Sequence, residues 1–201
     1  MREMVGALMP PMLGVRPKRR NARPPAWYAP GMETDALLER LAATPRRLAQ
    51  LVAEASDAAL DAAPPGEWSA REVLAHLRDL ELLVWRTGLA RILAEEEPQL
   101  AAFDQAAWAA RRWRLRERKE QLLGDFALQR QALLNVAAQL EGGHWRRQGR
   151  LPGGRRVSLW EWLEAVAAHD AEHFSQLEGL LGYTHAQAME RRRRWAEEWR
   201  P

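Results

Sequence analysis

The chain has 201 residues, which is enough for one domain with a sizeable hydrophobic core. It contains no cysteine, which excludes disulfides, thiolate metal ligands and a cysteine nucleophile, and we expect a cytoplasmic protein. The net charge is +3, but residues 1–31 carry a balance of +5, so residues 32–201 carry −2. This near-neutral balance removes the electrostatic argument for a folded nucleic-acid-binding domain, and no apolar run is long enough to span a bilayer.

Residues 1–31 contain six prolines and a basic cluster, with neither helical nor alternating periodicity, so we expect a disordered leader. Pro10 and Pro11 interrupt its apolar stretch and the positive charges follow that stretch, which argues against a signal peptide. A nucleic-acid-binding arm is one alternative. We favour a simple extension, or an upstream start codon, because Met32 directly precedes a plausible helix start.

The first helix is expected to begin at Thr34 or Asp35, and Pro45 is expected to kink or split it. It is predicted by apolar residues at helical spacing, namely Leu37, Leu41, Leu48, Leu51, Val52 and Ala55. A short turn follows, and Pro64-Pro65-Gly66 ends this part of the chain.

A capping box predicts the start of the second helix, because the side chains of Ser69 and Glu72 can each accept a hydrogen bond from a backbone N–H there. Its apolar stripe contains His76 and runs towards Ile92, and the helix is expected to end before Pro98.

A connection with a short helical turn near Asp104 leads into a basic segment, residues 111–119, with Trp113 inside it. An aromatic residue in a basic run is compatible with single-stranded nucleic acid, but Glu117 dilutes the charge and a solvated helix face is the better interpretation. The third helix is predicted by the apolar residues Leu122, Phe126, Leu133, Val136, Ala137 and Leu140.

The fourth helix starts at a second capping box, Ser158 to Glu161, and ends near Gly182. Residues 183–201 have helical propensity and form either a fifth helix packed on the bundle or a mobile end. With four long amphipathic helices and no alternating strand pattern, the expected fold is all-α. We predict an antiparallel four-helix bundle over residues 32–182, an additional C-terminal helix and the unstructured leader.

The fourth helix carries His169 and His173, which lie one turn apart on the same helix face and can hold one metal ion between them. A third ligand must come from another element, and His76 is the best candidate. A histidine in an apolar stripe is usually a core residue with a satisfied hydrogen bond. The pair favours metal ligands over core residues, because burying two imidazoles costs free energy unless their nitrogens are occupied. Three neutral imidazoles suit zinc, nickel, iron or manganese and leave a position open for catalysis.

These residues resemble the DinB-like (DNA-damage-inducible) superfamily over residues 34–182. The resemblance rests on the order and spacing of Trp68-Ser69, Glu72, His76-Leu77, Asp79, Glu81, Asp104, His169-Asp170-Ala171-Glu172-His173 and Gln176. It implies a four-helix bundle that holds a divalent metal through His76, His169 and His173, and it makes a homodimer plausible. Similar proteins include transferases and isomerases that use bacillithiol, mycothiol or glutathione, and metal-dependent hydrolases.

A rival motif covers the same residues, because His169 to His173 also matches the H-x-x-E-H pattern of inverted zincin peptidases. Those enzymes are larger α/β proteins, so neither the length nor the helical pattern fits. Glu172 lies about 60° from the histidine face, and we retain it with Gln176 as a weak catalytic candidate.

The resemblance leaves two classes of function open. The leading hypothesis is a metal-dependent enzyme acting on a small molecule, either a low-molecular-weight-thiol-dependent transferase or a hydrolase. The alternative is a non-catalytic helical stress-response or binding protein with a structural or vestigial metal site.

Overall fold

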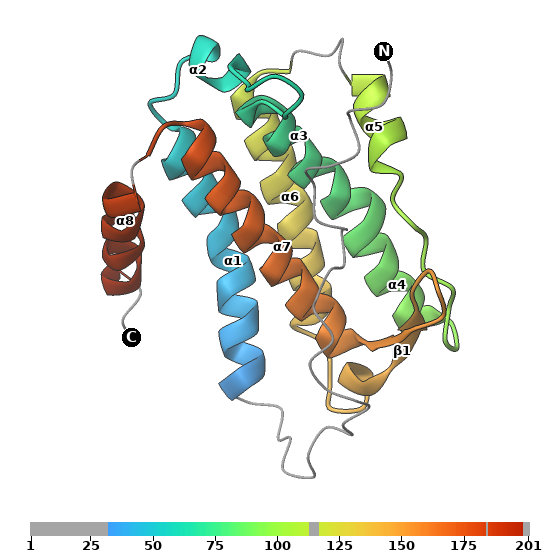
Figure 1. The fold of residues 1–201 in the computed structure, drawn as a ribbon. Coiled ribbons are helices and arrows are strands. Elements are labelled where there is room, and N and C mark those ends of the chain that lie inside the picture. The colour runs from blue at the N-terminus through green and yellow to red at the C-terminus, as the bar shows by residue number, and fades with distance from the viewer. Residues whose placement is uncertain (1–31, 113–116, 184, 199–201) are drawn as a thin grey trace.

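The computed structural model describes residues 32–112, 117–183 and 185–198, so the predicted leader and Trp113 lie outside the described residues. The bundle consists of four long helical units (Figure 1). They are α1 (Met32–Val52), the unit formed by α3 (Ala70–Leu80), η1 (Glu81–Arg86) and α4 (Thr87–Ala94), then α6 (Lys119–Ala137) and α7 (Leu159–Leu180). The shorter elements are α2 (Asp57–Asp61), α5 (Gln105–Arg112), η2 (His144–Arg146), β1 (Gln148–Arg150), β2 (Arg156–Ser158) and α8 (His185–Glu198).

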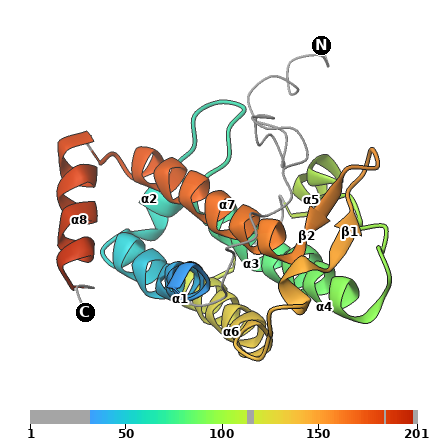
Figure 2. The same cartoon turned by 90° about the horizontal axis from the view of Figure 1, so that it is seen from below.

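Two of the packed helix pairs are antiparallel, α1 with α6 and α3 with α7 (Figures 1 and 2). Lys119 at the start of α6 donates to the carbonyl of Val52 at the end of α1 at 3.1 Å, whereas Arg130 further along α6 reaches Leu41 in the middle of α1. The four-helix bundle expected from the sequence is therefore confirmed.

The other two contacts are parallel, since α1 and α7 run one way and α3 and α6 run the other. Parallel neighbours need a connection that returns the chain to the same end of the bundle. Residues 95–112, which include α5, run from the end of α4 back towards the end of the bundle where α6 begins, as Figure 1 shows.

Helix starts are well predicted where a capping box is present. Ser69 and Ser158 are the N-caps of α3 and α7, and each makes both hydrogen bonds of its capping box. The helix α1 begins at Met32, before the expected start at Thr34 or Asp35, and it remains a single helix through Pro45.

Two local features were not predicted from the sequence. A π-helical segment, η1, joins α3 to α4, and a two-stranded antiparallel sheet pairs Gly149 with Val157. Each strand has only three residues, which is too short for an alternating pattern to stand out. The turn between the strands contains Gly153 and Gly154 at φ +87° and +85°, as expected for a glycine turn.

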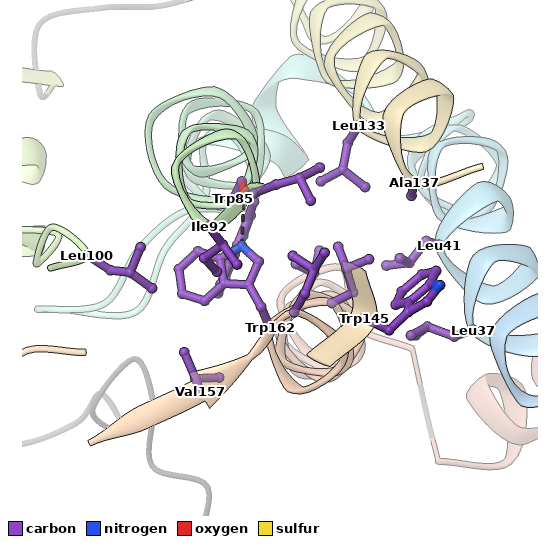
Figure 3. Packing of buried hydrophobic residues seen from close by; sticks show 14 of the residues in the cluster. Leu37, Leu41, Trp85, Ile92, Leu100, Leu133, Ala137, Trp145, Val157 and Trp162 are labelled. Atoms are coloured by element: carbon purple, nitrogen blue, oxygen red, sulfur yellow. Dashed lines mark hydrogen bonds between the residues drawn. The ribbon is translucent and has the colours of Figure 1, made fainter. Parts of the chain in front are cut away.

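The hydrophobic core has two clusters, one towards each end of the bundle. Figure 3 shows the first, which includes Leu37, Leu41, Leu133, Trp145 and Trp162. The second is formed by Leu48, Leu51, Val73, Phe126, Phe174, Leu177 and their neighbours. Between the two clusters α1, α6 and α7 place buried polar residues, namely Thr44, Arg130, His169 and Asp170.

Val136 departs from the expected pattern of α6, because its side chain is 42% exposed although it was assigned to the apolar face. Arg130, which was not assigned to that face, is fully buried. The predicted C-terminal helix is present as α8, which lies beside the end of α7 that it follows (Figures 1 and 2). No helix in the described ranges has the length and apolar character needed to cross a membrane.

Candidate metal centre

The three histidines predicted as a cluster come together in the middle of the bundle. His76 projects from α3, and His169 and His173 project from successive turns of α7. The Nε2 atom of His169 lies 3.3 Å from Nε2 of His76 and 3.1 Å from Nε2 of His173. One nitrogen from each ring thus fits within a span of 4.8 Å, as expected for ligands of a single ion.

Burial keeps these imidazoles neutral. His76 is fully buried and His169 is 7% exposed, whereas His173 is half-buried. Burial, with a smaller contribution from the neighbouring His173, lowers the pKa of His76 to about 3. Burial also lowers the pKa of His169 and His173. Neutral imidazole is the form that binds a metal, so the cluster is in its ligating state at neutral pH.

Gln176 determines which nitrogen of His173 is available. Its Oε1 atom lies 2.8 Å from Nδ1 of His173. Because an amide oxygen only accepts hydrogen bonds, we assign the proton to Nδ1, which leaves the Nε2 lone pair directed at the cluster. Hydrogen bonds of this kind fix the orientation of metal-ligating histidines.

Aromatic rings enclose the cluster on the α3 side. The His76 ring packs against Trp68 and Trp108, with centroid separations of 4.9 and 5.2 Å, and against Phe103 at 5.8 Å. Trp85 of η1 contacts His169 at 5.4 Å. These rings exclude water from the buried imidazoles and restrict their rotation.

A buried ion network supports the backbone next to His169. Arg130 lies between Glu81 and Asp170, and its contacts satisfy all five guanidinium N–H groups. The fifth acceptor is the carbonyl of Leu41, at 3.1 Å. Pro45, one turn later in α1, has no N–H to donate to that carbonyl, so Arg130 replaces the missing helix bond.

The donor set fits a divalent ion. The Nδ1 atoms of His76 and His169 are buried and find no hydrogen-bond partner among the described residues, and the three Nε2 atoms face one another. Three imidazoles crowded in this way have too few acceptors and donors to satisfy each other, whereas a shared cation would occupy all three Nε2 lone pairs.

Comparison with known families agrees with this geometry. A family model described as the DinB superfamily matches residues 40–177, which is more than half of the chain. The chain belongs to the DinB superfamily. The family expected from the sequence is therefore confirmed.

Solved structures share the fold of this DinB protein. It is similar to YfiT from Bacillus subtilis, described as a probable metal-dependent hydrolase with an unusual four-helix bundle topology. The TM-score is 0.67 at 20% identity, over 83% of this chain and 94% of YfiT. It is also similar to TT2238, a four-helix bundle protein, with a TM-score of 0.50 and 23% identity over 73% and 98% of the two chains. No curated protein matches the chain.

The weak catalytic candidates take different positions in the DinB bundle. Gln176 contacts His173, whereas Glu172 is exposed and no carboxylate joins the histidine cluster among the described residues. His144 lies away from the cluster, where its Nδ1 accepts from the backbone N–H of Glu141 at 3.0 Å.

Sequence reasoning missed four residues around the site, Trp85, Phe103, Trp108 and Arg130. Arg130 had a detectable signal, since it occupies an apolar-stripe position between Phe126 and Leu133 at helical spacing. Such a position requires buried acidic partners, and Glu81 and Asp170 supply them.

Proposed function

We propose that this DinB-superfamily protein is a metal-dependent enzyme whose divalent ion is held by His76, His169 and His173. The observation that carries the proposal is the convergence of one nitrogen from each ring within 4.8 Å, with Nε2 of His169 3.3 Å and 3.1 Å from Nε2 of His76 and His173. The Gln176 hydrogen bond to His173 supports it, because that bond leaves a ligating nitrogen free. Zinc, nickel, iron and manganese all accept such a nitrogen set.

A divalent ion held by these three neutral imidazoles would keep its full charge and an open position, and it would supply the chemistry of lowering the pKa of a bound water or thiol towards neutral pH. The residues of the chain then have simpler tasks. Gln176 orients His173, the aromatic rings limit water access, and the network around Arg130 holds the α7 backbone at His169. Glu172 is exposed, and we assign it no role as a base.

Hydrolysis of a small molecule is the first reaction class that we propose, and the fold shared with YfiT supports it. Thiol-dependent transfer is the second. It is compatible with a cluster that contains no carboxylate among the described residues, since a thiol bound to a divalent ion would lose its proton without a protein base. Bacillithiol, mycothiol and glutathione are the proposed co-substrates of that class.

Cobalt substitution separates the two classes. The chain has no cysteine, so any thiolate-to-cobalt charge-transfer absorption of the loaded protein must come from an added thiol. Each of the three thiols, and a non-thiol analogue of each, is titrated while the near-ultraviolet spectrum is recorded. A saturable band with one thiol, missing with its analogue, supports transfer and names the co-substrate.

The outcomes of this titration are distinct. Full cobalt stoichiometry without any thiol band leaves the hydrolase as the better function. If neither thiols nor small anions alter the visible spectrum of bound cobalt, the site is closed, and a non-catalytic protein with a structural metal replaces both proposals. Failure to bind a divalent metal at all rejects the metal centre itself.

A further inference from the structure

A cavity of about 160 Å³ adjoins the histidine cluster. It lies between η1, the connection before α5, the turn of the β1–β2 hairpin and the start of α7. Two of its walls, Trp85 and Phe103, are rings that also contact His169 and His76. Trp85 and Phe103 therefore line the cavity and also border the proposed metal centre.

The cavity walls are mostly apolar. All eight lining residues have hydrocarbon or aromatic side chains. The indole N–H of Trp162 is already used, since it donates to the carbonyl of Trp85 at 3.1 Å, as the dashed line in Figure 3 shows. A polar ligand would leave its own hydrogen-bonding groups unsatisfied here, which costs free energy.

The size of the cavity limits its occupant. An apolar cavity of about 150 Å³ is known to hold one benzene molecule. The rings of Trp85, Phe103 and Trp162 offer the edge and face contacts that aromatic ligands prefer. Ala101, Ala102 and Pro152 are the exposed lining residues, so a ligand enters between the connection and the hairpin turn.

We propose that this cavity binds an aromatic ring of the substrate, so that the natural substrate is a small molecule carrying one such ring next to its reacting group. The inference rests on the proposed metal-dependent function and adds the substrate class. It assigns substrate selection to the residues of the cavity and leaves metal binding to the histidines.

Two metal-binding probes that differ by a ring test this proposal. Acetohydroxamate and benzohydroxamate are titrated into the zinc-loaded protein by calorimetry. Burying a phenyl group contributes about 1.5–3 kcal/mol, so benzohydroxamate is expected to bind about tenfold to a hundredfold more tightly.

A cavity-filling variant and a matched control locate the effect. Ala102→Leu places a larger side chain at the cavity entrance and is expected to remove the benzohydroxamate advantage while acetohydroxamate binding stays unchanged. Ala63→Leu makes the same change at another exposed loop position and is expected to retain the advantage. Unchanged acetohydroxamate binding also shows that Ala102→Leu is folded with an intact centre.

A third titration tests the cavity in the absence of metal. Toluene, followed by saturation-transfer NMR on metal-free protein, is expected to bind saturably to the wild type and to Ala63→Leu, and at least about tenfold more weakly to Ala102→Leu. The polar ring 1,4-dioxane is expected not to bind.

The results separate the two proposals. If acetohydroxamate binds but benzohydroxamate binds no more tightly, or if Ala102→Leu keeps the advantage, the aromatic-substrate inference is overturned and the metal centre stands. If neither hydroxamate binds, the proposal of an open metal site is rejected. The toluene titration then tests separately whether the cavity binds an aromatic ring. If toluene does not bind, or binds equally to Ala102→Leu and wild type, the proposal that the cavity binds an aromatic ring is rejected as well.

Discussion

Arg130 on α6 and Asp170 on α7 form two hydrogen bonds, at 2.6 and 3.1 Å, in the interior of the bundle. Asp170 directly follows His169 in the sequence, and the pair lies between the two hydrophobic clusters in space. Glu81 binds the other edge of the same guanidinium through two bonds of 2.8 Å, and the carbonyl of Leu41 on α1 accepts a further bond, so a single cation links all four helical units. Their mutual attraction raises the pKa of Arg130 far above its ordinary value although burial opposes this, and the guanidinium stays charged.

Replacing Arg130 with Met should strongly destabilise the fold, because it leaves Glu81 and Asp170 buried without a counter-charge. The expected loss in unfolding free energy is about 3–5 kcal/mol, measured by urea denaturation. Arg40→Met is the control, since Arg40 and Glu164 form an exposed pair and its loss should cost less than about 1 kcal/mol. Equal effects of the two changes would contradict the role of the network.

Substitution of any one of the three clustered histidines should weaken metal binding. His76→Ala, His169→Ala and His173→Ala each leave an ion with two protein ligands, and we expect the affinity to fall by more than about a hundredfold. A competitive titration against a chromophoric chelator measures this. His144→Ala should bind metal like the wild type, because His144 lies outside the cluster. Metal loss in His144→Ala without loss in His76→Ala would reassign the α3 ligand.

Gln176→Ala should weaken metal binding about 10–100-fold, because His173 loses the acceptor that holds its Nδ1 proton. Gln176→Glu retains an acceptor oxygen and should keep most of the affinity. The exposed neighbour Glu172 is the matched control, and Glu172→Gln should leave the affinity unchanged. The same chelator titration applies, and an equal loss in Gln176→Ala and Gln176→Glu would contradict the role of Gln176 as a hydrogen-bond acceptor for His173.

The metal-free protein should lose stability as the pH falls below about 6.5. Burial lowers the pKa of His76 from 6.5 to about 3, so between these values the unfolded chain binds a proton that the folded chain does not. Acid therefore favours unfolding, by up to about 1.4 kcal/mol per pH unit from this group. Urea unfolding of chelator-treated protein at pH 7.5, 6 and 5 should give a shallower decline for His76→Gln than for the wild type.

Two helical glycines should respond oppositely to alanine. A Cβ atom at Gly88 would overlap the indole of Trp162, so Gly88→Ala should destabilise the protein by about 1–3 kcal/mol through overpacking. Gly124 on α6 has open space around it, and Gly124→Ala should stabilise the protein by about 0.5–1 kcal/mol because alanine is the better helix former. Thermal melts of the two variants should shift in opposite directions, and a tolerated Gly88→Ala would mean that α4 and α7 pack less closely.

Local chemistry explains why much of the architecture can be predicted from the sequence. The capping boxes at Ser69 and Ser158 use residues only three positions apart, so they specify the starts of α3 and α7 without any tertiary contact. The four-residue spacing of His169 and His173 likewise places both rings on one helix face. From these signals follow the bundle, the histidine pair and the choice of His76 as its partner.

Other features depend on contacts between residues far apart in the chain. The burial of Arg130 requires acidic partners 49 and 40 positions away, and the rings of Trp85 and Phe103 reach the histidines only when η1 and the connection before α5 pack beside α7. Sequence periodicity reports which side of a helix is buried, but it carries no information on which other helix lies there. The sequence by itself therefore determined the helices and their histidines, whereas the tertiary structure decided the ion network and the aromatic cavity, because both arise from side chains that meet only after the helices have packed.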